Sequence, residues 1–214
     1  MRAHLEARTR FFDSRVLSAI DAGITQIVIL GAGYDDRALR FRCPGVHFFE
    51  VDHPGTQIDK RLRLERMGAD LDAVTLVPAD FGEEEVAPVL ERNGHRDDRP
   101  SLVLAEGLLV YLDRDAIVAL LRGVGRRAAA GSELAASLAV HPEGFDSAWV
   151  VSRANATRPG AEAEPWRTIL PASAYLDLVS RSGWTVVEAV DDASLGTGAV
   201  PGRSVLVLAT RGAG

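Results

Sequence analysis

The sequence predicts an α/β fold: a Rossmann-like three-layer sandwich with a mostly parallel seven-stranded sheet and an antiparallel last strand. Short apolar runs alternate along the chain with segments of helical periodicity, as in a sheet with helices on both faces. The first of these runs, 26–30, leads directly into Gly31 and Gly33, which is typical of the first turn of a nucleotide-binding unit. Nothing helical separates the last two runs, 184–190 and 204–209, which favours an antiparallel final strand.

Length and composition bound the class of protein. A chain of 214 residues is expected to form a single domain, 1–214, around one sizeable core. The net charge of −6 argues against a nucleic-acid-binding surface, and the single cysteine, Cys43, excludes an internal disulfide. No Cys/His spacing suggests a metal site, and no apolar run reaches membrane-spanning length, so we expect a cytoplasmic protein that contacts no membrane.

The first half of the chain alternates clearly between helical and extended patterns. Leu5, Phe12, Val16 and Ile20 recur at helical spacing until Gly23, which predicts a helix over 3–22. The first strand candidate is apolar, as a parallel strand buried on both faces should be. Strands are expected at 26–30, 46–51, 74–77 and 101–105, with a short helix from about residue 35, a helix capped by 53–56 that runs to about 67, and a helix over 83–93.

The second half is less regular. A helix is expected over 113–127 with Asp113 as its N-cap, followed by a strand at 132–140. The stretch 141–165, rich in Pro, Gly, Ala and Glu, is too long for a simple connector, so we expect a lid or inserted helix on the substrate side within 141–170. A helix over 172–182 and strands at 184–190 and 204–209 complete the prediction.

Four successive strands are each followed by a glycine pair or an acid. In an open α/β sheet, ligands bind at the carboxyl ends of the strands, where the strand order reverses. A lone acid at a strand end is more often a turn or cap residue, but all four together favour a binding site. The residues are Gly31 with Gly33, Asp52, Asp80 and Glu106.

Each of these residues suits one part of a nucleoside ligand. The glycines permit close backbone approach or positive φ. Asp52 can accept hydrogen bonds from a ribose diol, with Glu50, on the same strand face, as the second choice. Asp80 can receive an adenine amino group, with Phe81 beside the base, and Glu106 can favour an amino group or a sulfonium centre.

The residues after the glycines distinguish between ligands. A dinucleotide fingerprint needs a third small residue, whereas Gly33 is followed by Tyr34, Asp35 and Asp36. Two carboxylates at a helix start would repel a pyrophosphate, which disfavours a nicotinamide-dependent dehydrogenase. They suit a ligand with an adenosine and a positive centre, which describes S-adenosylmethionine.

Five motifs, in order and spacing, resemble the leucine carboxyl methyltransferase family. They are Arg8-Thr9-Arg10-Phe11-Phe12-Asp13, Leu30-Gly31-Ala32-Gly33-Tyr34-Asp35, Phe49-Glu50-Val51-Asp52-His53-Pro54, Ala79-Asp80-Phe81 and Ala105-Glu106-Gly107-Leu108-Leu109-Val110-Tyr111-Leu112. The resemblance covers most of the chain to about Tyr111 and continues more loosely beyond it. It implies a class I methyltransferase that uses S-adenosylmethionine.

The resemblance also implies roles for particular residues. Arg8 would grip the methionine carboxylate, with Arg10 as its rival. The remaining cofactor contacts would be Gly31, Asp52, Asp80 with Phe81, and Glu106.

The sequence departs from the family pattern twice. Asp36 stands where the family usually has Thr, and we expect it to pair with Arg37 or Arg40. Family members typically carry several dozen residues before the Arg-rich helix, and these help to cover the cofactor. This sequence begins almost at that helix, so we expect the cap to be missing.

The resemblance implies a small-molecule methyl acceptor, because its bacterial branch methylates oxygen atoms of polyketides and other natural products. A carboxylate acceptor is ionised at neutral pH and needs no general base, whereas a hydroxyl acceptor needs one. Candidates for that base are His53, His141, Tyr111 and Glu106, and we expect Tyr111 to orient the acceptor.

The acceptor pocket is expected to draw on 141–171. Trp149 and Trp166 offer aromatic walls, and Arg167 offers a partner for an anion. The alternative is that the tryptophans cover the sheet and Arg167 is solvated. A methyltransferase-like partner protein that binds the cofactor without turnover is the alternative function.

Overall fold

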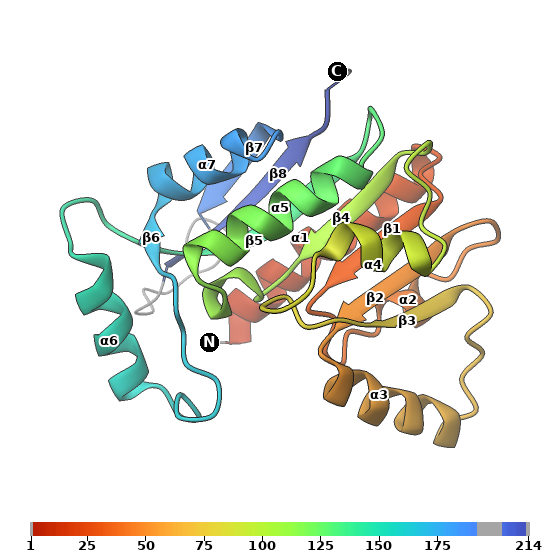
Figure 1. Ribbon diagram of the computed structural model, residues 1–214, viewed down its shortest axis with the longest axis horizontal. Helices are drawn as coiled ribbons and strands as arrows, with labels where there is room; N and C mark the ends of the chain where they lie inside the picture. Colours follow the sequence, from red (N-terminus) through yellow and green to blue (C-terminus); the bar gives the residue numbers. More distant parts are fainter. Residues whose placement is uncertain (1, 192–202, 213–214) are drawn as a thin grey trace.

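The computed structural model describes residues 2–191 and 203–212. Its helices cover both faces of one central sheet, so the predicted three-layer sandwich is confirmed (Figure 1). The helices are α1 (Arg2–Asp21), α2 (Arg37–Arg40), α3 (Pro54–Arg66), α4 (Val86–Arg92), α5 (Arg114–Arg127), α6 (Ser147–Thr157) and α7 (Ala172–Arg181), with a 3₁₀ turn, η1 (Leu109–Tyr111).

The sheet has the order β3-β2-β1-β4-β5-β8-β7, with β6 paired to the end of β5. All the neighbouring pairs are parallel except those of β8, which is antiparallel to both β5 and β7. This confirms the predicted mostly parallel sheet with an antiparallel last strand. The strands are β1 (Gln26–Leu30), β2 (His47–Asp52), β3 (Val74–Pro78), β4 (Ser101–Ala105), β5 (Glu133–His141), β6 (Leu170–Pro171), β7 (Thr185–Asp191) and β8 (Arg203–Thr210).

Two apolar layers hold the helices to the sheet. Side chains alternate along each strand, so Val28 and Leu30 of β1 face one layer and Ile27 and Ile29 face the other. The first layer contains buried residues of α4, α5 and α7, which lie in front of the sheet in Figure 1. The second contains buried residues of α1 and α2, and α1 lies behind the sheet. Both apolar faces of the sheet are therefore covered.

The structure differs from the prediction mainly on the substrate side. The stretch expected as a lid or inserted helix contains α6. The chain then returns along that helix to the two-residue strand β6, which pairs with β5. With β6, the sheet has eight strands among the described residues, whereas seven were predicted. No residue of α6 is fully buried. The expected helix over 83–93 begins only at Val86, because the N–H groups of residues 83 and 84 donate to the Asp80 carbonyl and form a turn there.

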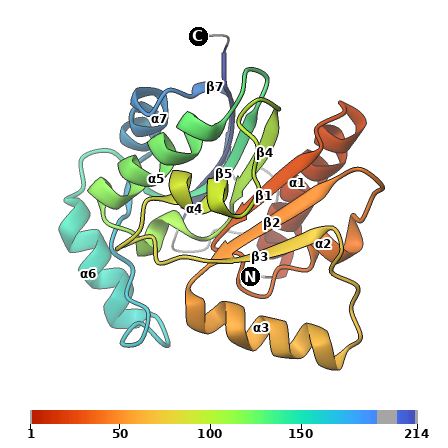
Figure 2. The ribbon, with the colours of Figure 1, turned by 45° about the vertical axis from the view of Figure 1, so that its right-hand side comes forward.

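Figure 2 shows α6 and α3 projecting on opposite sides of the edge where the parallel strands end.

Candidate functional site

The strand order reverses around β1, which lies between β2 and β4. In a sheet of this kind the ligand crevice forms at the carboxyl ends of these central strands. Gly31 follows β1, Asp52 ends β2 and Glu106 follows β4, so the structure brings these three predicted residues to one edge.

The turn after β1 requires glycine at two positions. Gly31 and Gly33 have φ of +63° and +45°, a left-handed conformation that costs other residues steric energy. A Cβ on Gly31 would lie 2.9 Å from the Leu108 side chain, whereas a Cβ on Gly33 would meet nothing within 4 Å. The turn thus packs closely on the segment after β4 at Gly31, and it borders open space at Gly33.

The half-buried Asp52 faces this turn. Its carboxylate accepts hydrogen bonds from the N–H of Gly33 at 2.7 Å and from the N–H of His53 at 2.6 Å. These bonds fix the carboxylate beside the glycines, and each oxygen keeps lone-pair capacity for a ligand hydroxyl.

Glu106 has two arginine partners. Arg8 Nε lies 2.7 Å from Oε1, and Arg37 contacts Oε2 at 2.8 Å. The structure thereby places Arg8 at the site. Its rival Arg10 is 81% exposed and lies near Glu6.

Arg37 is a buried cation that the sequence reasoning considered only as a possible partner of Asp36. Its side chain is 5% exposed and pairs with Asp13, Asp35 and Glu106. Burial alone would lower the pKa of Arg37, but the charges of Asp35 and Glu106 outweigh it and raise the pKa. The sequence held one signal for this role of Arg37, which is its position two residues after Asp35 in the turn that follows the glycines.

The two carboxylates after Tyr34 are neutralised within the fold. Asp35 pairs with Arg37, and Asp36 pairs with Arg40 at 2.7 Å, which is one of the two partners expected for Asp36. Repulsion of a pyrophosphate by these charges is therefore weaker than the sequence suggested. Discrimination against a dinucleotide therefore depends mainly on the missing third glycine, because an acid at the end of β2 such as Asp52 suits the ribose of either ligand.

Glu50 is occupied elsewhere. Its side chain is 2% exposed, and the Lys60 ammonium lies 2.6 Å from its carboxylate. Burial raises the pKa of Glu50, although the charge of Lys60 opposes the shift. We therefore keep Asp52, and not Glu50, as the candidate for the ribose.

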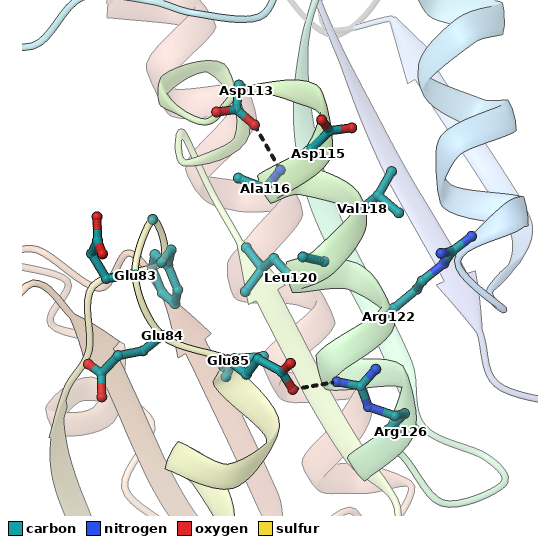
Figure 3. Close-up of a pocket in the computed structure, with 14 residues that line it drawn as sticks. Glu83, Glu84, Glu85, Asp113, Asp115, Ala116, Val118, Leu120, Arg122 and Arg126 are labelled. Carbon is teal, nitrogen blue, oxygen red and sulfur yellow. Dashed lines mark hydrogen bonds and ion pairs between the residues drawn. The ribbon is translucent and has the colours of Figure 1, made fainter.

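Asp80 and Phe81 lie beyond β3. Asp80 accepts a hydrogen bond from the Gly82 N–H at 2.8 Å, and the His53 ring nitrogen Nε2 lies 3.9 Å from its other oxygen. Phe81 packs against the core, next to an open groove of about 610 Å³ that separates residues 82–86 from α5. Figure 3 shows this groove, with Glu83, Glu84 and Glu85 across from α5 and Glu85 bonded to Arg126. Of the predicted site residues, Phe81 alone lines the groove.

The substrate-side segment is bound to the turn after Glu106. The backbone N–H groups of Arg167 and Thr168 both donate to Val110 O, at 2.7 and 3.2 Å. The Arg158 guanidinium lies over the Trp166 ring and the Tyr111 ring, 5.0 and 5.9 Å from their centroids. The predicted residues Tyr111 and Trp166 are thus linked through Arg158.

Other predicted residues have different roles. Trp149 is 58% exposed and stacks on Phe145. His53 Nδ1 accepts a hydrogen bond from Gly55 N–H at the start of α3, so it acts as a cap. His141 is buried, and both its ring nitrogens are hydrogen-bonded, one to Pro142 O and the other to the Ser147 hydroxyl. Neither histidine is positioned as a free general base.

Two features are absent from the described residues. No helix among them is both long and apolar enough to cross a membrane. They contain no group of three or more His, Cys, Asp or Glu side chains that could hold a metal ion.

The mostly parallel sheet with its antiparallel strand β8 gives the chain a Rossmann-like α/β fold that solved methyltransferase structures share. A solved structure from Thermobifida fusca titled "putative methyltransferase" aligns with 98% of this chain and 82% of its own, with a TM-score of 0.72 and 18% identity. The mitomycin 7-O-methyltransferase MmcR aligns with 88% of this chain and 49% of its own, with a TM-score of 0.58 and 19% identity. At these identities the likeness shows the fold alone.

Sequence comparison identifies the family. The family described as leucine carboxyl methyltransferase matches residues 1–125, and the chain belongs to this family. A Frankia alni protein named "Putative S-adenosyl-L-methionine-dependent methyltransferase" is 41% identical over 134 residues, which is 61% of this chain and 46% of that protein. The chain spans about half the length of the first curated relatives it matches.

Proposed function

We propose that this protein binds S-adenosylmethionine at the edge formed by β1, β2 and β4, and that it transfers the methyl group to an oxygen of a small molecule. The observation that carries the proposal is the placement of two carboxylates, Asp52 and Glu106, on either side of the glycine turn. Family membership and the names of its relatives support the cofactor.

The residues present fit this cofactor. Open space borders Gly33, where a ligand could approach the backbone. Asp52 would accept hydrogen bonds from the ribose hydroxyls. Arg8 would hold the methionine carboxylate and Glu106 the amino group, so the ion pair that they form with each other would be exchanged for two ion pairs with the ligand. Asp80 and Phe81 would adjoin the adenine.

S-adenosylmethionine supplies a methyl group that is already activated on a sulfonium sulfur. The chain's residues mainly have to hold donor and acceptor in line and exclude water. His53 and His141 are engaged in hydrogen bonds, and Glu106 is paired with two arginines. Because three of the four candidate bases, all except Tyr111, are occupied, an acceptor that is ionised at neutral pH, such as a carboxylate, fits the site better than a neutral hydroxyl.

The direct test has two stages. Calorimetric titration with S-adenosylmethionine and with S-adenosylhomocysteine is expected to give micromolar binding, or about −8 kcal/mol. Tritium-labelled S-adenosylmethionine is then offered with a panel of aromatic carboxylic acids and phenols, and the organic products are counted. Absence of binding would overturn the proposal, and binding without transfer to any acceptor would favour a cofactor-binding partner protein that does not turn over.

A further inference from the structure

A cavity of about 370 Å³ lies between α6, the segment 167–170 and the start of α5. Figure 1 shows α6 and the chain leading to β6 running side by side. Ala148, Val151, Ile169 and Leu170 give the cavity an apolar wall. Its volume is at the lower end of the range for small-molecule sites.

Two arginines, Arg114 and Arg167, line this apolar cavity. Both are exposed, and neither forms an ion pair with any residue that the structure describes. Arginines such as Arg8, Arg37 and Arg40 are paired with acids, whereas exposed arginines such as Arg153 have no ion pair among the described residues. Arg114 and Arg167 differ from Arg153 because they border the same apolar cavity. Two unpaired guanidinium groups on one apolar cavity therefore mark a place where the chain leaves positive charge available.

Two helix starts also border the cavity. Arg114 and Ser147 are the first residues of α5 and α6, and both line the cavity. Helix N-termini carry partial positive charge. The carboxylates of the capping residues Asp113 and Asp146 accept amide hydrogen bonds in these first turns and offset this partial charge, so the positive charge at the cavity comes from the two arginines.

One wall of the cavity is hydrogen-bonded to the turn that follows Glu106. Arg167 and Thr168 line the cavity, and their backbone N–H groups donate to Val110 O. Val110 belongs to η1, which closely follows Glu106. The Thr168 hydroxyl also donates to Leu112 O at 2.6 Å.

We propose that this cavity binds the anionic group of the methyl acceptor, and that Arg114 and Arg167 select small aromatic or otherwise apolar molecules that carry a carboxylate. The inference rests on the proposed function, since it names the acceptor class for that reaction. Guanidinium groups bind carboxylates through charge-assisted, often bidentate hydrogen bonds, and the apolar wall accommodates the body of the ligand. A neutral isostere would lose the charge-assisted hydrogen bonds to the arginines and keep the contact with the apolar wall.

The test compares 2-naphthoate with its neutral isostere 2-naphthamide, using the 214-residue protein and ligand-observed NMR titration. Naphthoate is expected to bind at least about tenfold more tightly than naphthamide. Arg114→Gln and Arg167→Gln should each weaken naphthoate binding several-fold and leave naphthamide binding unchanged. Arg153→Gln is the matched control, because Arg153 is an exposed arginine of α6 that does not line the cavity.

Titration of each variant with S-adenosylhomocysteine separates the two proposals. Suppose that S-adenosylhomocysteine binds, but that naphthoate and naphthamide bind equally tightly or both fail to bind. The proposed carboxylate-binding role of the cavity is then wrong, and the proposed cofactor site stands. If naphthoate binds through both arginines but S-adenosylhomocysteine does not bind, the anion site stands and the methyltransferase proposal fails. An equal loss of naphthoate binding in Arg153→Gln would also overturn the pocket, because it would indicate a general effect of surface charge.

Discussion

Arg8 of the first helix and Glu106 after β4 form an ion pair at 2.7 Å, and Arg37 holds the other oxygen of the same carboxylate at 2.8 Å. The Arg8 and Glu106 side chains are 28% and 17% exposed, so solvent reaches both partners. Arg37, in contrast, is buried and keeps Glu106 in place whether or not Arg8 is engaged. The pair can therefore open toward a zwitterionic ligand without releasing Glu106.

Replacement of Arg8 tests this relationship. Arg8→Gln is expected to weaken S-adenosylhomocysteine binding by about tenfold or more, since a charge-assisted hydrogen bond to the ligand carboxylate is lost. Arg10→Gln is the control in the same helix, and it should leave the affinity unchanged because Arg10 is largely exposed near Glu6. Calorimetry on both variants decides the assignment. Equal affinities would remove Arg8 from the site.

Asp52→Ala is expected to reduce cofactor binding below detection while the fold persists. The carboxylate is the predicted acceptor for the ribose hydroxyls, and it also fixes the Gly33 N–H. Calorimetry measures the binding, and circular dichroism with a thermal melt checks the fold. A folded variant with wild-type affinity would refute the ribose assignment.

The buried pair Glu50–Lys60 should contribute to stability and not to binding. Glu50→Gln leaves the Lys60 ammonium buried without its counter-charge, which is expected to cost about 3 to 5 kcal/mol in the free energy of unfolding. Arg63→Gln breaks the exposed Asp59–Arg63 pair of the same helix and should change stability far less. Urea unfolding gives both values. A small effect of Glu50→Gln would indicate that Lys60 is solvated.

Gly31→Ala should impair both folding and cofactor binding. The positive φ costs about 1–2 kcal/mol for a residue with a Cβ, and the new methyl group would also displace the Leu108 side chain. Gly23→Ala is the control, because Gly23 has φ of +84° but a Cβ there meets nothing within 4 Å. Thermal melts should show a larger loss for Gly31→Ala, and the affinity for S-adenosylhomocysteine should fall only in that variant. Equal losses of stability with unchanged affinity would contradict the close packing of this turn.

Acid should destabilise the fold through His95. Burial, assisted by the charge of Arg127, lowers the pKa of this histidine from 6.5 to about 4. The unfolded chain therefore binds the proton first, and stability present above pH 6.5 is lost as the pH falls toward 4, by up to about 3 kcal/mol. His95→Gln should lose less stability than the wild type between pH 7 and pH 5 in urea unfolding. Identical losses would show that other groups control the pH dependence.

The sequence was sufficient to predict the sheet and to predict which residues meet at the edge where we propose that the cofactor binds. Strands β1 and β4 are buried at every position, so their short apolar runs clearly indicated buried strands. The first and last residues of both strands were predicted correctly. Because parallel strands end at one edge, the positions of Asp52 and Glu106 along the chain indicated their proximity in space. The expected strand at 204–209 was also found, as part of β8, whereas residues 192–202 lie outside the described part of the chain.

The substrate side and the buried arginine could not be predicted in the same way. Helix α6 has no fully buried residue, so it leaves no apolar stripe in the sequence, and β6 is too short to show a pattern. Arg37 lies on a four-residue helix, and its three acidic partners come from separate segments. Only the folded arrangement of those segments shows that Arg37 is a buried centre of charge.

Hydrogen bonds to Val110 O and Leu112 O join the two halves of the proposed reaction site. Val110 O accepts the N–H groups of both Arg167 and Thr168, so the segment after α6 cannot shift without breaking bonds to the turn that follows Glu106. A substitution in this segment that admits a different acceptor would then also move residues next to the donor. On this scaffold, a change in acceptor preference is expected to alter donor affinity as well.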